Sequence, residues 1–243
     1  MSVQTYATVE QLGAAAADFV EARLRSTISA KGKAHLVLAT GASQLTFLNS
    51  LKERDVAWDA ITVFHLDEYT GLSEDHPASF RRYLRERILD EVRPAEVHLI
   101  DASAADLNAE IRRYEGLLKS HPLDVACIGI GENGHIAFND PPVADFDDAR
   151  LVKEVELDHA CRMQQVNEGW FPSLEETPPR AVTLTIPAVM SSGVISCVVP
   201  GERKAEAVDR ALNGPISPAC PASILRRHND TTLFLDRSSA ARI

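Results

Sequence analysis

The chain has 243 residues, of which 45% are hydrophobic and 25% charged, a composition typical of a globular protein with a sizeable core. Its net charge of −10 argues against a general binder of nucleic-acid backbones, which usually carries a basic face, but leaves room for one small phosphorylated ligand. Four cysteines without a C-x-x-C pair, no leader-like segment in MSVQTYATVEQ and no apolar run of about 18 residues predict a cytoplasmic protein with reduced thiols and no membrane span.

Short apolar runs rich in β-branched residues alternate with longer helical patterns. In chain order, strands are expected at residues 34–40, 61–67, 96–100 (the weakest), 124–130, 181–186, 194–199 and 231–236. Helical patterns cover residues 7–28, 43–53, 78–92, 105–119 and 202–212. The alternation predicts a three-layer, doubly wound, Rossmann-like α/β fold with a mostly parallel sheet, forming a single domain over residues 1–243.

The longest stretch without a clear pattern runs from about residue 140 to residue 180. It contains five prolines, and irregular stretches of this length in a compact domain are often lids or binding loops. We therefore expect a functional loop there, with Trp170 and Phe171 either walling a site or packing the loop itself.

Polar residues follow four of the predicted strands, at residues 40–43, 67–69, 131–135 and 201–204. In open parallel sheets, ligands bind beyond the carboxyl ends of the strands. The four loops are therefore expected to meet at one edge of the sheet and to form a ligand site.

Two of these loops suggest anion binding. Thr40, Gly41, Ala42 and Ser43 form a turn of small residues that opens a helix, so its backbone N–H groups can receive a phosphate; a plain turn capped by Ser43 is the alternative. Lys204 lies in the first turn of a helix, where a nearby anion would explain a cation that the helix dipole disfavours. A solvated surface lysine is the alternative there.

The loop after the second strand carries adjacent carboxylates at Asp67 and Glu68. Neighbouring strand residues face opposite ways, so one of the two is expected to enter the cleft, where it can move a proton between neighbouring atoms. A turn-forming acid near Gly71 is the alternative.

The stretch GIGENGHIAFNDPP (129–142) contains the G-x-G-x-x-G spacing of a dinucleotide-binding loop. That use requires a helix directly after the third glycine, and Pro141 and Pro142 prevent a long one. The favoured interpretation is a tight turn that presents His135 as a general acid/base, with Asp140 close enough to orient it. A purely structural loop histidine is the alternative.

The blocks HLDEYTGLSEDHPASFRRYL (65–84) and GIGENGHIAFNDP (129–141) resemble the glucosamine-6-phosphate deaminase family, in the wider glucosamine-6-phosphate isomerase/6-phosphogluconolactonase group. The resemblance extends from about Leu36 to Leu235, and the run G-H-I-A-F-N is typical of the deaminase branch. It implies a hydrolase that converts glucosamine 6-phosphate, or a close amino-hexose 6-phosphate, and water to fructose 6-phosphate and ammonia. No metal or organic cofactor is implied.

By the same resemblance, Asp67 moves the proton between C1 and C2, and His135 is the acid/base that opens the sugar ring. Asp140 takes the place of the family's glutamate beside the histidine. Asn133 stands where many members have aspartate as a further partner of the histidine.

The family arginine that grips the phosphate has no clear match in CRMQQVNEGWF (161–171). Either Arg162 or Arg203 replaces it, or the substrate differs, in its sugar or in having no phosphate. The residues expected to contact the substrate or its phosphate are Thr40, Gly41, Ala42, Ser43, Glu68, Gly131, Arg162, Arg203 and Lys204.

The expected partner is a small sugar phosphate, with no nucleic acid or membrane, and assembly into a homo-oligomer is left open. Two alternatives remain: a 6-phosphogluconolactonase-like hydrolase, which would need His135 but no C1/C2 proton shuttle, and a non-catalytic sugar-phosphate sensor. The joint presence of Asp67, His135 and Asp140 weighs against the sensor, because a pure binder needs no proton-transfer groups.

Overall fold

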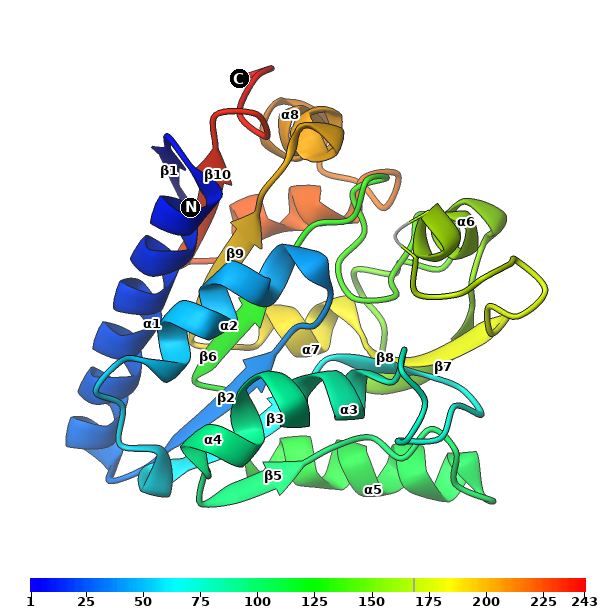
Figure 1. Ribbon diagram of the computed structural model, residues 1–243, viewed down its shortest axis with the longest axis horizontal. Coiled ribbons are helices and arrows are strands. Elements are labelled where there is room, and N and C mark those ends of the chain that lie inside the picture. The colour runs from blue at the N-terminus through cyan, green and yellow to red at the C-terminus, as the bar shows by residue number, and fades with distance from the viewer. Residues whose placement is uncertain (168) are drawn as a thin grey trace.

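A computed structural model describes residues 1–167 and 169–243, and its centre is a parallel sheet (Figure 1). Within the described residues this sheet has seven strands in the order β1-β10-β9-β6-β2-β3-β5, all paired in parallel. The strands are β1 (Ser2–Tyr6), β2 (Ala34–Leu38), β3 (Ile61–His65), β5 (Glu96–His98), β6 (Val125–Ile128), β9 (Val194–Val199) and β10 (Thr231–Asp236). The doubly wound, mostly parallel α/β fold expected from the sequence is confirmed.

Helices cover both faces of this sheet. They are α1 (Val9–Lys31), α2 (Leu45–Lys52), α3 (Phe80–Leu84), α4 (Asp90–Val92), α5 (Leu107–Ser120), α6 (His159–Asn167), α7 (Ile186–Met190) and α8 (Ala205–Asn213). Alternation along β2 separates two cores: Leu36 and Leu38 pack toward α1 and α2, whereas Val37 packs toward α5, α7 and α8. The expected helix over 78–92 is interrupted by a π turn (Arg85–Leu89) between α3 and α4.

A second sheet was not expected from the sequence. It is antiparallel and pairs β4 (Asp67–Tyr69), β8 (Arg180–Leu184) and β7 (Val152–Glu156). The run expected as a strand over 181–186 therefore pairs here, outside the parallel sheet. The stretch expected to be irregular contains both β7 and α6. The reason is that β7 is half-exposed and polar, so its pattern reveals little until β8 pairs with it.

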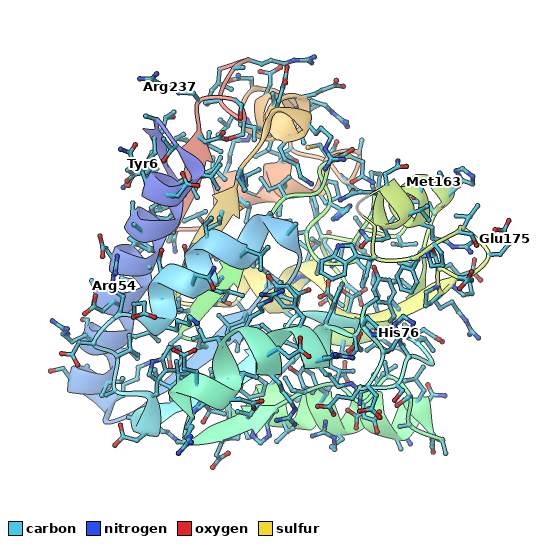
Figure 2. All side chains as sticks on the ribbon, in the orientation of Figure 1. Tyr6, Arg54, His76, Met163, Glu175 and Arg237 are labelled. Carbon is cyan, nitrogen blue, oxygen red and sulfur yellow. The ribbon has the colours of Figure 1, made fainter. Side chains whose placement is uncertain are left out.

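This small sheet supports a third core at the side of the molecule where β7, β8 and α6 lie (Figure 1). Tyr69, Phe138 and Phe171 are buried together, and His76 stacks on Phe171 with ring centroids 5.7 Å apart. The labelled side chains of His76 and Met163 lie at this same end (Figure 2). The third core thereby holds α6 and its flanking loops beside the carboxyl edge of the parallel sheet.

The sequence patterns did not predict two further elements, the edge strand β1 and the short helix α7. β1 is mostly exposed, so its residues lack the apolar pattern of the central strands. α7 begins at Ile186 and is capped by Thr185, whose hydroxyl accepts from the N–H of Ala188, with Pro187 in the first turn. Among the helices of the described residues, none is both long and apolar enough to cross a bilayer.

Candidate active site

A cavity of about 450 Å³ opens beyond the carboxyl ends of the parallel strands. It brings together residues from all four polar loops singled out in the sequence, including Thr40, Asp67, His135 and Lys204. The remaining lining residues are Val9, Ala39, Gly41, Ala42, Ser43, Leu66, Phe80, Gly129, Ile130, Gly131, Ala137, Phe138, Gln164, Gln165, Trp170, Pro200, Gly201, Glu202 and Arg203.

The turn between β2 and α2 is led by a glycine and lines the cavity. Gly41 has φ 94°, which favours glycine, and a short 3₁₀ turn (Ala42–Gln44) leads into α2. Tyr83 donates its hydroxyl to the carbonyl of Gly41 at 2.8 Å, and the buried Gln44 side chain donates to Ser43 Oγ at 3.1 Å. These contacts hold the turn in which residues 40–43 line the cavity.

The turn between β9 and α8 repeats this geometry on the other side of the cavity. Gly201 has φ 97° and is followed by a 3₁₀ turn (Glu202–Lys204). Its N–H donates to Asp236 Oδ1 at 2.9 Å. Burial alone would raise the pKa of Asp236, but hydrogen bonds from Ser238, the N–H of Gly201 and Ser239 outweigh it and lower the pKa to about 2. An ionised Asp236 therefore anchors the turn that carries Lys204.

Asp67 is the first residue of β4 and is buried beneath the cavity. Burial, and secondarily the neighbouring Glu68 carboxyl, raises the pKa of Asp67 to about 8. A carboxyl that titrates near neutral pH can exist in both protonation states under working conditions. Asp67 can therefore both take and return a proton.

Glu68 was expected to contact the substrate, but it is buried and is not among the residues that line the cavity. Its carboxylate accepts from the N–H groups of Tyr69, Phe80 and Arg81 at 3.0–3.1 Å and from Ser79 Oγ at 2.8 Å. It thus holds the start of α3. Burial raises the pKa of Glu68 and these hydrogen bonds oppose the rise.

His135 lies in a three-residue hydrogen-bonding unit. Its Nδ1 is 2.9 Å from Asp140 Oδ1, and Asn133 Nδ2 donates to the same oxygen at 2.7 Å. Asn133 Oδ1 accepts from the backbone N–H of His135 at 3.0 Å. Burial of Asp140 would raise its pKa, but His135, Asn133 and Cys161 together hold the pKa below its usual value. The shorter aspartate therefore reaches the imidazole.

The glycine loop is shaped around this imidazole. A Cβ at Gly131 would lie 2.1 Å from His135 Cε1, and one at Gly134, where φ is 92°, would lie 2.7 Å from Cys220 Sγ. Farther along, Asn139 Nδ2 donates to the carbonyl of Leu184 at 2.8 Å and ties the loop to β8. Within the described part of the chain, no helix follows Gly134 before α6, so the dinucleotide geometry is absent there.

Replacing Gly131 with alanine is expected to lower kcat by roughly 10²-fold, because the new methyl group must displace the imidazole by an ångström or more. Steady-state kinetics on glucosamine 6-phosphate, the substrate that the sequence resemblance implies, measure this. Gly116→Ala is the matched control, since a Cβ at that position in α5 meets nothing within 4 Å. A Gly131→Ala enzyme as fast as the control would contradict the close fit.

Arg162 does not line the cavity. Its guanidinium donates to the carbonyls of Leu174 and Thr177, the latter at 2.9 Å, and so braces the loop after α6. Of the two arginines expected near a phosphate, Arg162 is therefore the one that the structure does not bring to the cavity. Arg203 does line the cavity, but its Nε also lies 3.3 Å from Glu132 Oε1.

Gln164 and Gln165 on α6 also line the cavity, and the sequence patterns did not predict this. Trp170 also lines the cavity and meets Tyr83 edge-on at 6.2 Å, in keeping with a wall, whereas Phe171 is buried in the third core. The run M-Q-Q on a short helix does not by itself predict a ligand site. Such a prediction would require knowing which face of α6 lies toward the cavity.

The fold and cavity define a class of protein: an α/β protein in which two glycine-led helix starts share a cavity with a carboxyl and a histidine–carboxylate pair. The family model "Glucosamine-6-phosphate isomerases/6-phosphogluconolactonase" matches residues 7–234. The chain belongs to this family.

Individual relatives agree with this assignment. Glucosamine-6-phosphate deaminase of Listeria innocua is 37% identical over 206 residues, which cover 85% of this chain and 86% of the relative. The enzyme of the same name from Clostridium acetobutylicum is 34% identical over 224 residues, or 89% and 91% of the two chains.

Solved structures extend the comparison. The structure of a monomeric glucosamine-6-phosphate deaminase superimposes with a TM-score of 0.91 at 35% identity over 100% of both chains. A 6-phosphogluconolactonase from Shewanella baltica superimposes with a TM-score of 0.81 at 21% identity over 97% of both chains, which shows a shared fold alone.

Proposed function

We propose that the protein is a glucosamine-6-phosphate deaminase, which converts glucosamine 6-phosphate and water to fructose 6-phosphate and ammonia. One observation carries the proposal: Asp67 and His135, the latter held by Asp140, face the same cavity as the two glycine-led turns. The names of the curated relatives and of the solved structure at 35% identity support the same activity.

The substrate's phosphate would bind between the two turns. The N–H groups of residues 41–43 and the start of α2 supply hydrogen-bond donors and the positive end of a helix dipole. Lys204 supplies a full positive charge from the facing turn, and Arg203 lies beside it on the cavity wall. Held there, the sugar extends toward Asp67 and His135.

His135 would open the sugar ring by moving a proton between the anomeric hydroxyl and the ring oxygen. Its Nδ1 faces Asp140, which leaves Nε2 for the sugar. Asn133 and Asp140 act as positioning residues, because their contacts fix the tautomer and the orientation of the imidazole.

Asp67 would then carry the isomerisation. It takes the proton from C2 of the open-chain amino aldehyde and returns a proton to C1. One N–H proton passes to O1 at the same time, so that the double bond moves from C1=O to C2=N and C1 becomes a hydroxymethyl carbon. Water adds to this imine at C2, and ammonia leaves as the C2 carbonyl of fructose 6-phosphate forms. Because the last step consumes water, the overall reaction has the balance of a hydrolysis.

An ammonia-release assay over a panel of 2-amino-2-deoxyhexose 6-phosphates, with the unphosphorylated sugars as controls, tests the proposal. Glucosamine 6-phosphate is expected to be the best substrate and the unphosphorylated sugar a poor one. Binding of the phosphate sugar without ammonia release would instead indicate a sensor. Hydrolysis of 6-phosphogluconolactone without ammonia release would indicate a lactonase.

Lys204→Ala is expected to raise KM for glucosamine 6-phosphate roughly 10- to 100-fold, because one charge-assisted contact contributes about 1.5–3 kcal/mol. The change should fall on KM more than on kcat, since the phosphate contact is present before and during the reaction. Lys33→Ala, at an exposed position next to the start of β2, is the control. An unchanged KM in Lys204→Ala would remove Lys204 from the phosphate site.

A further inference from the structure

A second cluster of ligating side chains lies at the opposite end of the parallel sheet from the cavity. Glu96 and His98 are on the edge strand β5, and His121 directly follows the last residue of α5. One ligand atom of each lies within 4.8 Å of those of the other two. His121 packs against His35, the second residue of β2, with ring centroids 5.0 Å apart, so this end of the cluster lies near the amino ends of the strands, whereas the cavity lies at their carboxyl ends.

The register of the sheet places these side chains on one face. Thr62 pairs with Glu96 and Phe64 with His98, so Glu96 and His98 share the face on which Phe64 packs toward α5. The ring centroid of Phe64 lies 5.2 Å from that of His98 and 5.9 Å from that of His121. The two imidazoles, 5.7 Å apart, are therefore held by the aromatic core beside them.

The tautomer of His121 suits a metal ligand. Its Nδ1 lies 2.9 Å from the carbonyl oxygen of Leu117, which can only accept a hydrogen bond. Nδ1 therefore carries the ring proton, and Nε2 keeps its lone pair. Metal-ligating histidines characteristically donate the other ring N–H to a carbonyl or carboxylate in this manner.

The remaining contacts of the cluster are compatible with a cation. Glu96 Oε2 lies 3.2 Å from His98 Nε2. The nearby Arg113 is neutralised by Glu110, to which its Nε and Nη2 donate at 2.6 and 2.7 Å. His35, buried and edge-on to His121 at 5.0 Å, has an Nε2 without a hydrogen-bond partner among the described residues.

We propose that Glu96, His98 and His121 bind a divalent transition-metal ion of the zinc class. Two imidazoles and one carboxylate are a ligand set that suits Zn²⁺, Co²⁺ or Ni²⁺ better than Mg²⁺ or Ca²⁺, which prefer oxygen. Tetrahedral zinc requires ligand atoms about 3.4 Å apart, so the three ligand atoms, which lie within 4.8 Å of one another, draw together on the ion. The exposed Glu96 side chain is the one with most room to move.

The ion would take the lone pair of His121 Nε2 and replace the proton of His98 Nε2, which moves to Nδ1 of the same ring. Water fills the outward position. Bound there, the metal ties the edge strand β5 to the end of α5. The proposed deamination needs no metal, so this site is independent of it.

The test is a cobalt titration of the chelator-treated, untagged full chain, followed by visible absorption and by competition with Zn²⁺. One equivalent is expected to bind, with the d–d bands of nitrogen and oxygen ligation. Glu96→Gln and His121→Gln are each expected to weaken binding at least about 10-fold. His159→Gln, an exposed histidine on α6, is the control and should bind as the wild type does.

Thermal unfolding without metal checks that both variants fold, and added Zn²⁺ should raise the melting temperature of the wild type but much less that of the variants. Binding in which the wild type is no tighter than His121→Gln would overturn the proposal. Thiolate charge-transfer bands would do the same, because they would place the ion on cysteine. No substrate is used, so failure here leaves the deaminase proposal untouched.

Discussion

His135→Gln is expected to lower kcat roughly 10²–10⁴-fold, the usual contribution of general acid/base catalysis, and to leave KM for glucosamine 6-phosphate nearly unchanged. Glutamine keeps polar atoms at that position, but it has no group that can take up and release a proton near neutral pH. The proposed phosphate contacts lie on the turns at residues 40–43 and 201–204, which this substitution does not touch. Steady-state kinetics from pH 5 to 9 measure both constants.

The control for this variant is His159→Gln, which removes an exposed imidazole from α6 and should retain full kcat. Full activity in His135→Gln would mean that the loop is structural. Saturable micromolar binding of NADH by the wild type would mean that the glycine spacing serves a nucleotide after all.

Asp67→Asn is expected to abolish isomerisation, with a fall in kcat of roughly 10⁴-fold or more, because an amide can neither take the C2 proton nor return one to C1. Glucosamine 6-phosphate should still bind, since Lys204 and the two turns are unchanged. The same variant retaining hydrolysis of 6-phosphogluconolactone would favour the lactonase alternative.

The same substitution is expected to make the protein more stable at high pH. The pKa of Asp67 rises from 3.8 to about 8 on folding, chiefly through burial. Between these values the folded state holds a proton that the unfolded state has lost, so stability falls as pH rises through this window. Asparagine cannot ionise and avoids this loss. The melting temperature of Asp67→Asn should therefore exceed that of the wild type most at pH 9 and least at pH 4, and a pH-independent difference would contradict the buried carboxyl.

The parts of the site that could be predicted from sequence are those determined locally. Gly41 and Gly201 each follow an apolar strand closely and precede a helix. This pattern can be recognised from a few consecutive residues, because the glycine permits the positive φ that the turn needs. Strands of the parallel sheet could also be predicted locally, because a strand covered on both faces is apolar nearly throughout. Residues 194–199 and 231–236 are examples, and the structure buries almost all of them.

Other features depend on chain segments that are distant in sequence. β7 is a strand because β8 pairs with it about 28 residues later, and its own polar residues do not indicate this. Glu68 turns away from the cavity because the N–H groups at the start of α3 need an acceptor. Arg162 turns away because the carbonyls of Leu174 and Thr177 need donors.

The contact between Asp140 and His135 could not be predicted from the local sequence either. Ala137 adopts φ 52°, uncommon for a residue with a Cβ, and this turn folds the chain back between His135 and Asp140. The loop therefore brings a short carboxylate to within 2.9 Å of the imidazole, a distance for which residue spacing alone gives no indication.

The central claim is that Asp67 and His135 act on one phosphorylated amino sugar. The most direct measurement incubates the purified chain with glucosamine 6-phosphate and quantifies ammonia and fructose 6-phosphate in the same samples, with Asp67→Asn alongside. Equimolar products are expected from the wild type and none above background from the variant. Ammonia without fructose 6-phosphate, no turnover in the wild type, or equal turnover in the variant would contradict it.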